Sequence, residues 1–196
     1  MTTQLVNVIG KVNSGLATKR VCSALADDYG AMISYGPTSG TVKVLATALD
    51  AIGVQDKAKF LENVSITVGD VIYLPFKVGA AGKYPWPAQV AIVAHECEHV
   101  EQGHDGWMGF WPRYFTSKAH RAAYEATALA AELEVYYRLT GRMLDVVGLA
   151  KGLEWYKVGK ADIAVTAKHL AIVKNTLERG GEVSDQMRVI VKALTN

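Results

Sequence analysis

Apolar residues recur at intervals of three and four along most of this chain, and this spacing is typical of amphipathic helices. The region 4–29 is predicted to form one long or two short helices. Further helices are predicted at 42–52, about 56–62, 117–139, 143–156, 163–177 and 184–194. Glycines at 53, 141 and 180–181 stand where these helices would stop. The pattern therefore predicts a predominantly helical protein.

One segment departs from the helical period and approaches the alternation of a β-strand. Its apolar positions are Val64, Ile66, Val68, Val71, Tyr73 and Phe76, with Gly69-Asp70 as a turn signal between the two halves. A β-hairpin or a bent edge strand is predicted, so the fold class is α+β. An unpaired edge could receive an extended peptide through Ile66, Val68, Val71 and Tyr73. The alternative is a strand that only covers the core.

Length and composition favour one globular domain. The chain has 196 residues, of which 50% are hydrophobic and 20% charged, and no linker divides it. We divide it into N-terminal helices (1–63), a strand and site region (64–140) and C-terminal helices (141–196). The net charge of +2 is too small to favour a nucleic-acid partner. Since neither a membrane span nor a secretory signal is recognisable and only two cysteines occur, a cytoplasmic location is expected.

The sequence HECEH, residues 95–99, carries the strongest chemical signal. On a helix, His95 and His99 lie one turn apart on the same face and can direct two imidazole nitrogens at one metal ion. Glu96 can then hold the water that completes the coordination, as in HExxH zinc hydrolases. The apolar run 89–94 favours a buried helix, and prolines at 85 and 87 mark its start. The alternative is that both histidines are ordinary, partly buried residues.

A catalytic zinc site with three protein ligands needs one more residue. Asp105 has the spacing of an HExxHxxGxxD motif, but Gln102 stands where that motif has glycine. The next helix offers Glu125 and, two turns later, Glu132. We prefer Glu125 because small residues flank it and permit a close helix approach, whereas Glu132 has the sequence context of a surface acid.

The segment 103–121 is rich in glycine and aromatic residues and is predicted to be a loop that folds over the site or the core. A zinc hydrolase of the HExxH type also needs a donor for the oxygen on which negative charge develops. The residues that compete for this role of transition-state stabiliser are Tyr114, His120, Arg121 and Tyr124.

The succession of TVGDVIYLPF, AHECEHVEQ, HDGW and AYEATA resembles a group of small, gluzincin-like HExxH metallopeptidases of bacteria and their phages. In that group a strand precedes the HExxH helix, and a glutamate on a later helix is taken as the third ligand. The resemblance covers about residues 67–132 and implies a zincin-like fold. It also implies that His95, His99 and Glu125 bind the metal and that Glu96 is catalytic.

The resemblance implies a peptidase that holds one Zn²⁺ ion and cleaves a peptide or protein substrate. The position where thermolysin-like enzymes carry an aspartate that orients a histidine is Leu129 here, so any such group must come from elsewhere. The alternative function is a phage virion or scaffold component that keeps a zincin fold with little or no turnover. In that case the protein is virion-associated and its partner is a larger phage or bacterial assembly.

Overall fold

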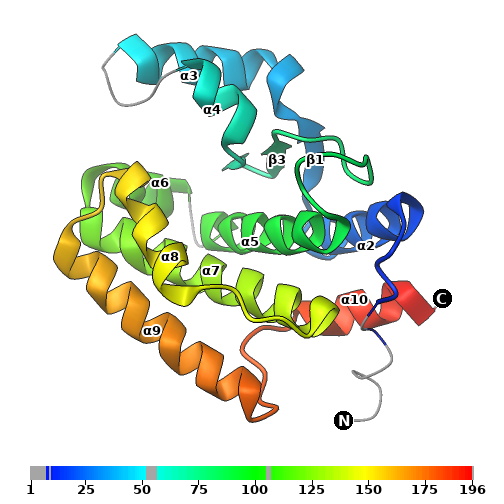
Figure 1. Ribbon diagram of the computed structural model, residues 1–196. Coiled ribbons are helices and arrows are strands. Elements are labelled where there is room, and N and C mark those ends of the chain that lie inside the picture. Colours follow the sequence, from blue (N-terminus) through cyan, green and yellow to red (C-terminus); the bar gives the residue numbers. More distant parts are fainter. Residues whose placement is uncertain (1–7, 9, 52–56, 105–106, 196) are drawn as a thin grey trace.

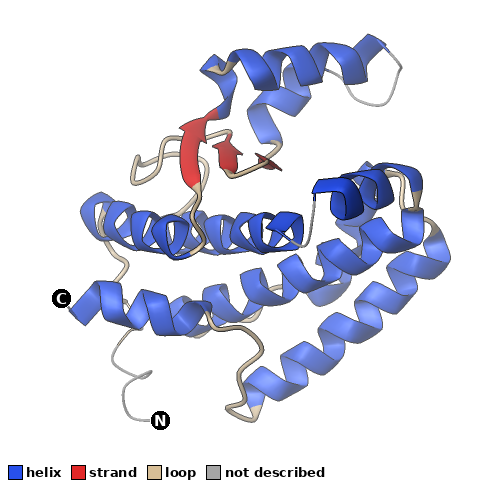
Figure 2. Ribbon diagram, turned by 180° about the vertical axis from the view of Figure 1, so that it is seen from behind, coloured by secondary structure: helices blue, strands red, loops and turns tan. Residues whose placement is uncertain are grey.

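The computed structural model describes residues 8, 10–51, 57–104 and 107–195. Its central element is helix α5 (Trp86–His104), which carries the HECEH sequence. A small sheet lies on one side of α5, and α7 (Lys118–Thr140) and α10 (Gln186–Thr195) lie on the other (Figure 1). Figure 2 shows the same layers from behind, with the strands above α5 and the long helices below it. The site helix is therefore enclosed between two layers.

The other elements complete an α+β fold that is predominantly helical, as predicted. In chain order they are α2 (Gly15–Asp28), β1 (Met32–Tyr35), η1 (Gly36–Thr38), α3 (Gly40–Ala51), α4 (Lys57–Asn63), β2 (Ile66–Val68), β3 (Val71–Leu74), α6 (Trp107–Thr116), α8 (Val146–Gly152), η2 (Leu153–Tyr156) and α9 (Lys160–Glu178).

The sheet has three strands in the order β1-β3-β2. β2 and β3 form the predicted antiparallel hairpin, and Gly69 takes the positive φ of 60° that its turn requires. The prediction omitted β1, which pairs in parallel with β3. β1 has only four residues, none of them buried, so its sequence carries no clear alternation. β3 is consequently the middle strand, and β2 and β1 form the two edges.

The main core surrounds α5 and contains residues from the N-terminal (1–63), middle (64–140) and C-terminal (141–196) parts of the chain. Val21 of α2, Val93 of α5 and Ile190 of α10 are each completely buried in this one cluster. A polar residue also fixes the start of α5: the amide of Gln89 donates to the backbone oxygens of Ala80 and Tyr84 and accepts from the Gly79 N–H. These bonds hold the connection from the sheet against the helix.

Helix α7 begins and ends as its sequence predicts. The Ser117 side chain accepts from the His120 N–H at the N-terminus, and Gly141 adopts the left-handed conformation at the C-terminus. Three expectations need correction. The helix expected over 4–29 begins only at Gly15 in the described part of that region, and residues 4–7 and 9 lie outside the described residues. Residues 107–116 of the aromatic segment form helix α6 instead of a loop, although Pro112 lies inside it. The helix expected over 143–156 is shorter and is followed by the 3₁₀ turn η2.

No helix within the described residues combines the length and the apolar character needed to cross a lipid bilayer.

Candidate metal centre

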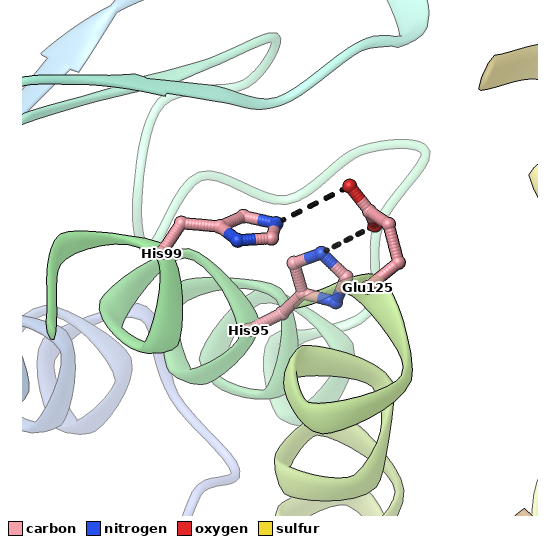
Figure 3. Close-up of side chains that lie close together, drawn as sticks. All are labelled: His95, His99 and Glu125. Atoms are coloured by element: carbon pink, nitrogen blue, oxygen red, sulfur yellow. Dashed lines mark ion pairs between the residues drawn. The ribbon is translucent and has the colours of Figure 1, made fainter. Parts of the chain in front are cut away.

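Helices α5 and α7 bring together three side chains that could bind a metal ion. His95 and His99 project from one face of α5, and Glu125 reaches them from α7 (Figure 3). The Nε2 atom of His95 lies 3.5 Å from Oε2 of Glu125, and Nε2 of His99 lies 3.5 Å from Oε1. One ligand atom from each residue lies within 4.8 Å of the other two. The group could therefore hold a metal ion, with the third ligand on the predicted helix.

The spacing of these atoms and their donor chemistry suit a transition-metal ion. Two ligand atoms about 2.1 Å from a tetrahedral ion lie roughly 3.4 Å apart. Each histidine Nε2 lies 3.5 Å from a different oxygen of the Glu125 carboxylate, close to that value, so both rings face the carboxylate at a distance that leaves room for an ion between them. Two imidazole nitrogens and one carboxylate form a donor set that catalytic zinc sites use. Asp105, the alternative third ligand, lies outside the described residues.

Glu125 is ionised although it is buried. Its side chain is 2% exposed, and burial by itself would raise its pKa. The neighbouring His99 and His95 and a hydrogen bond from Tyr114 outweigh burial and lower the pKa of Glu125 to about 2. The Tyr114 hydroxyl donates this bond to Oε1 over 2.6 Å. The carboxylate is thus held in the charged form that binds a cation.

Glu132 orients His95. Its Oε2 lies 3.0 Å from Nδ1 of His95, on the side of the ring away from Glu125. The expectation that Glu132 is a surface acid is wrong: it is half-buried, two turns beyond Glu125 on the same face of α7. Glu132 therefore supplies the orienting carboxylate that Leu129 cannot provide.

Gln102 orients His99. Its amide nitrogen donates to the backbone oxygen of Tyr124 over 3.1 Å, so its oxygen must face the histidine. That oxygen lies 2.9 Å from Nδ1 of His99. Because an amide oxygen only accepts, Nδ1 must carry the proton, and the lone pair on Nε2 is left for a metal.

Glu96 lies beside these three side chains, on the face of α5 that contacts β2. It is 4% exposed, and the Thr67 hydroxyl donates to its Oε2 over 2.8 Å. Burial raises the pKa of Glu96, although His95, His99 and Thr67 act in the opposite direction. A carboxylate with a raised pKa holds an abstracted proton more readily, as a general base must.

A cavity of about 760 Å³ opens above these residues and reaches from the sheet to α8. Its polar lining includes His95, Glu96, His99 and Glu125. Apolar side chains make up much of its walls: Leu45, Val64, Ile66, Ile92, Phe110, Leu129, Leu149 and Leu153. The arrangement of a few polar groups in an apolar cavity is typical of a ligand-binding site.

No family model, curated protein or solved structure matches the chain. The resemblance to gluzincin-like metallopeptidases rests on the sequence motifs alone and stays a prediction.

Only two of the four expected transition-state stabilisers line the cavity, namely Tyr114 and Arg121. Tyr114 donates its hydroxyl to Glu125, and Arg121 donates to the backbone oxygens of Tyr114, Phe115 and Tyr156. His120 is exposed and contacts the Ser117 hydroxyl, and the Tyr124 ring packs 4.8 Å from Phe110. His120 and Tyr124 are therefore not placed for this role.

The expected substrate strand is reduced to β2. Val71 and Tyr73 belong to the middle strand β3, where each is paired with β1 on one side and with β2 on the other. They cannot offer an open edge, and this part of the prediction is corrected. Ile66 and Val68 lie on β2, an outer strand of the sheet. Ile66 also lines the cavity that His95, His99 and Glu125 line, so this edge borders the candidate site.

The sequence did not predict the supporting positions of four residues that lie at this site: Thr67, Gln102, Glu132 and Tyr156. Gln102 follows His99 by three positions on the same helix, which is the spacing of side-chain neighbours, so it could have been found. The sequence places Glu132 on the same helix face as Glu125, but its context predicts a surface acid. Thr67 and Tyr156 come from separate elements, and no local pattern connects them with HECEH.

Proposed function

We propose that the protein is a zinc-dependent metallopeptidase. The observation that carries the proposal is the convergence of His95, His99 and Glu125 beside the buried carboxylate of Glu96, in the lining of a cavity bordered by a sheet edge. A bound zinc would supply Lewis acidity for activating a water molecule and polarising the scissile carbonyl. Glu96 would accept the proton of the attacking water and pass it to the leaving amine.

The cavity suits an extended peptide. In the proposal, the outer edge of β2 pairs with the peptide backbone, and one side chain next to the cleaved bond enters the apolar part of the cavity. Phe110, Leu149 and Leu153 line that part and offer no charge to a substrate side chain. Substrates with a large apolar residue next to the cleaved bond should therefore be preferred.

The first experiment measures the metal content of the purified protein and its cleavage of a mixed peptide library. We expect about one zinc per chain. Glu96→Gln should keep the zinc and lose cleavage, because an amide cannot act as the base. Glu101→Gln is a matched control, since Glu101 is an exposed glutamate on the same helix. Its activity should equal that of the wild type.

The outcomes separate the proposal from its alternatives. Cleavage that survives in Glu96→Gln would refute the mechanism. Zinc binding without cleavage of any library peptide would favour the alternative of a zincin-like structural component. A protein that binds no zinc, and whose melting temperature does not change with chelator, would contradict the metal centre itself.

A further inference from the structure

The 3₁₀ turn η2 brings a residue to the candidate metal centre from the region 143–156, for which the sequence predicts only a helix. Tyr156 is the last residue of η2 and is half-buried. It lines the same cavity as His95, Glu96 and Glu125. A segment more than 50 positions after HECEH thus forms part of the site wall.

The backbone around Tyr156 is fixed on both sides. Lys157, which follows it, has a φ of 58° and is the one non-glycine residue with positive φ in the described part of the chain. This conformation is disfavoured for residues with a side chain and is common at functional sites. The Arg121 guanidinium donates to the backbone oxygens of Tyr156 and Tyr114. Arg121 thereby ties η2 to α6 across the cavity wall.

The Tyr156 hydroxyl remains available to a ligand. No hydrogen bond joins it to another described residue, whereas the Tyr114 hydroxyl is engaged by Glu125. Burial raises the pKa of Tyr156 well above its ordinary value, and the negative charges of Glu125, Glu96 and Glu132 raise it further. The phenol is therefore protonated at neutral pH and can act as a hydrogen-bond donor.

We propose that the hydroxyl of Tyr156 donates a hydrogen bond to the carbonyl oxygen of the scissile peptide bond and stabilises the negative charge that develops there. This assignment rests on the proposed peptidase function. Tyr156 would be the transition-state stabiliser that the sequence did not identify. His120 and Tyr124 do not line the cavity, and the guanidinium of Arg121 already donates to backbone oxygens. A donor fixed in a largely apolar cavity is effective because little water competes with it.

The test compares Tyr156→Phe with the wild type and with Tyr124→Phe, all loaded with zinc. Removing the Tyr156 hydroxyl should lower kcat about 100-fold, with KM changed by less than about threefold. Zinc content and melting temperature should stay at wild-type values, since the hydroxyl bonds to no described residue. Tyr124→Phe should behave as the wild type.

A second measurement does not depend on turnover. A phosphonate analogue of the cleaved peptide carries anionic oxygens in the tetrahedral geometry of the transition state. By calorimetry, Tyr156→Phe should bind this analogue about 10- to 100-fold more weakly, while its affinity for the hydrolysed product peptide stays unchanged. If the role of Tyr156 were purely structural, Tyr156→Phe would bind the analogue and the product peptide more weakly by the same factor.

Wild-type kcat and analogue affinity in Tyr156→Phe would overturn the assignment and leave the peptidase proposal intact. An equal loss of affinity for analogue and product would also overturn it. If the zinc-loaded wild type neither cleaves peptides nor binds the analogue, the peptidase proposal fails and the assignment fails with it. The wild-type measurement therefore identifies which of the two inferences is wrong.

Discussion

The Nδ1 atom of His99 donates a hydrogen bond to the side-chain oxygen of Gln102 over 2.9 Å. The amide of Gln102 cannot turn around without losing its own bond to the Tyr124 backbone oxygen. The ring of His99 is therefore held in one orientation and one tautomer, with Nε2 facing the other ligands. Gln102, which is not one of the three candidate metal ligands, thus fixes the orientation in which His99 could bind a metal ion.

Replacing Gln102 should weaken metal binding. In Gln102→Ala the His99 ring loses its acceptor, and we expect zinc affinity to fall about 10- to 100-fold. Competition with a chromogenic chelator would measure this change. Glu101→Ala removes the preceding, exposed side chain and should leave affinity unchanged. Equal affinities of the two variants would contradict the orienting role.

Zinc affinity should depend on pH through His95. Burial disfavours the charged ring, but Glu125 and Glu132 outweigh it and raise the pKa of His95 well above its ordinary value. The metal-free protein therefore holds a proton on His95 at neutral pH, and zinc must displace it. Below that pKa, each unit of falling pH should lower the apparent affinity about tenfold.

Calorimetry in buffers of different ionisation enthalpy would detect the displaced proton. We expect release of about one proton per zinc at neutral pH from this residue. Glu132→Gln removes one of the charges that raise the pKa of His95, so it should reduce this release. A zinc affinity that is constant between about pH 6 and pH 8, without proton release, would contradict the prediction.

Glu134 should contribute strongly to stability. Its Oε2 accepts hydrogen bonds from the Val183 N–H and from both the N–H and the hydroxyl of Ser184. These bonds attach the connection between α9 and α10 to α7. Glu134→Ala leaves the donors without their acceptor and should lower the free energy of unfolding by about 3 kcal/mol.

Urea denaturation would measure this effect against a control. Glu178 is a half-exposed glutamate of α9, 3.8 Å from Lys174, and Glu178→Ala should change the free energy of unfolding by less than about 1 kcal/mol. If both substitutions lower the free energy of unfolding equally, Glu134 does not hold the connection between α9 and α10.

The two cysteines should be chemically inert in the folded protein. Cys22 and Cys97 are completely buried, and burial raises the pKa of Cys22 to about 12 and that of Cys97 still further. We expect no alkylation by iodoacetamide near neutral pH and modification of both thiols in denaturant, as measured by mass spectrometry. Rapid labelling of Cys97 in the folded chain would show that the HECEH helix opens.

The sequence predicted what depends on local spacing. The pair His95 and His99 needs only a helix to share a face, and α7 is bounded by the residues Ser117 and Gly141, whose side-chain and backbone preferences are local. Helix α6 was missed because its glycine, proline and aromatic content is typical of loops. Its ring contacts with other elements, such as that of Phe110 with Tyr124, stabilise the helix. These contacts exist only in the folded protein.

The supporting residues could not be predicted for the same reason. Glu132 differs from a surface acid only because α7 packs against α5 at His95. Tyr156 reaches the cavity because Arg121 holds its backbone and Lys157 accepts an unusual φ. Such relationships depend on how helices distant in sequence are placed, and no periodicity encodes them.

The Thr67 hydroxyl joins the middle of β2 to the carboxylate of Glu96. In the proposed function, this single contact fixes the position of a peptide paired with β2 relative to the catalytic carboxylate. A peptide that shifts by one residue along β2 moves its bonds by about 3.4 Å relative to Glu96 and turns its side chains to the opposite face. The register of the backbone pairing with β2 would then determine which peptide bond is cleaved. The apolar cavity would determine which side chain is preferred next to that bond.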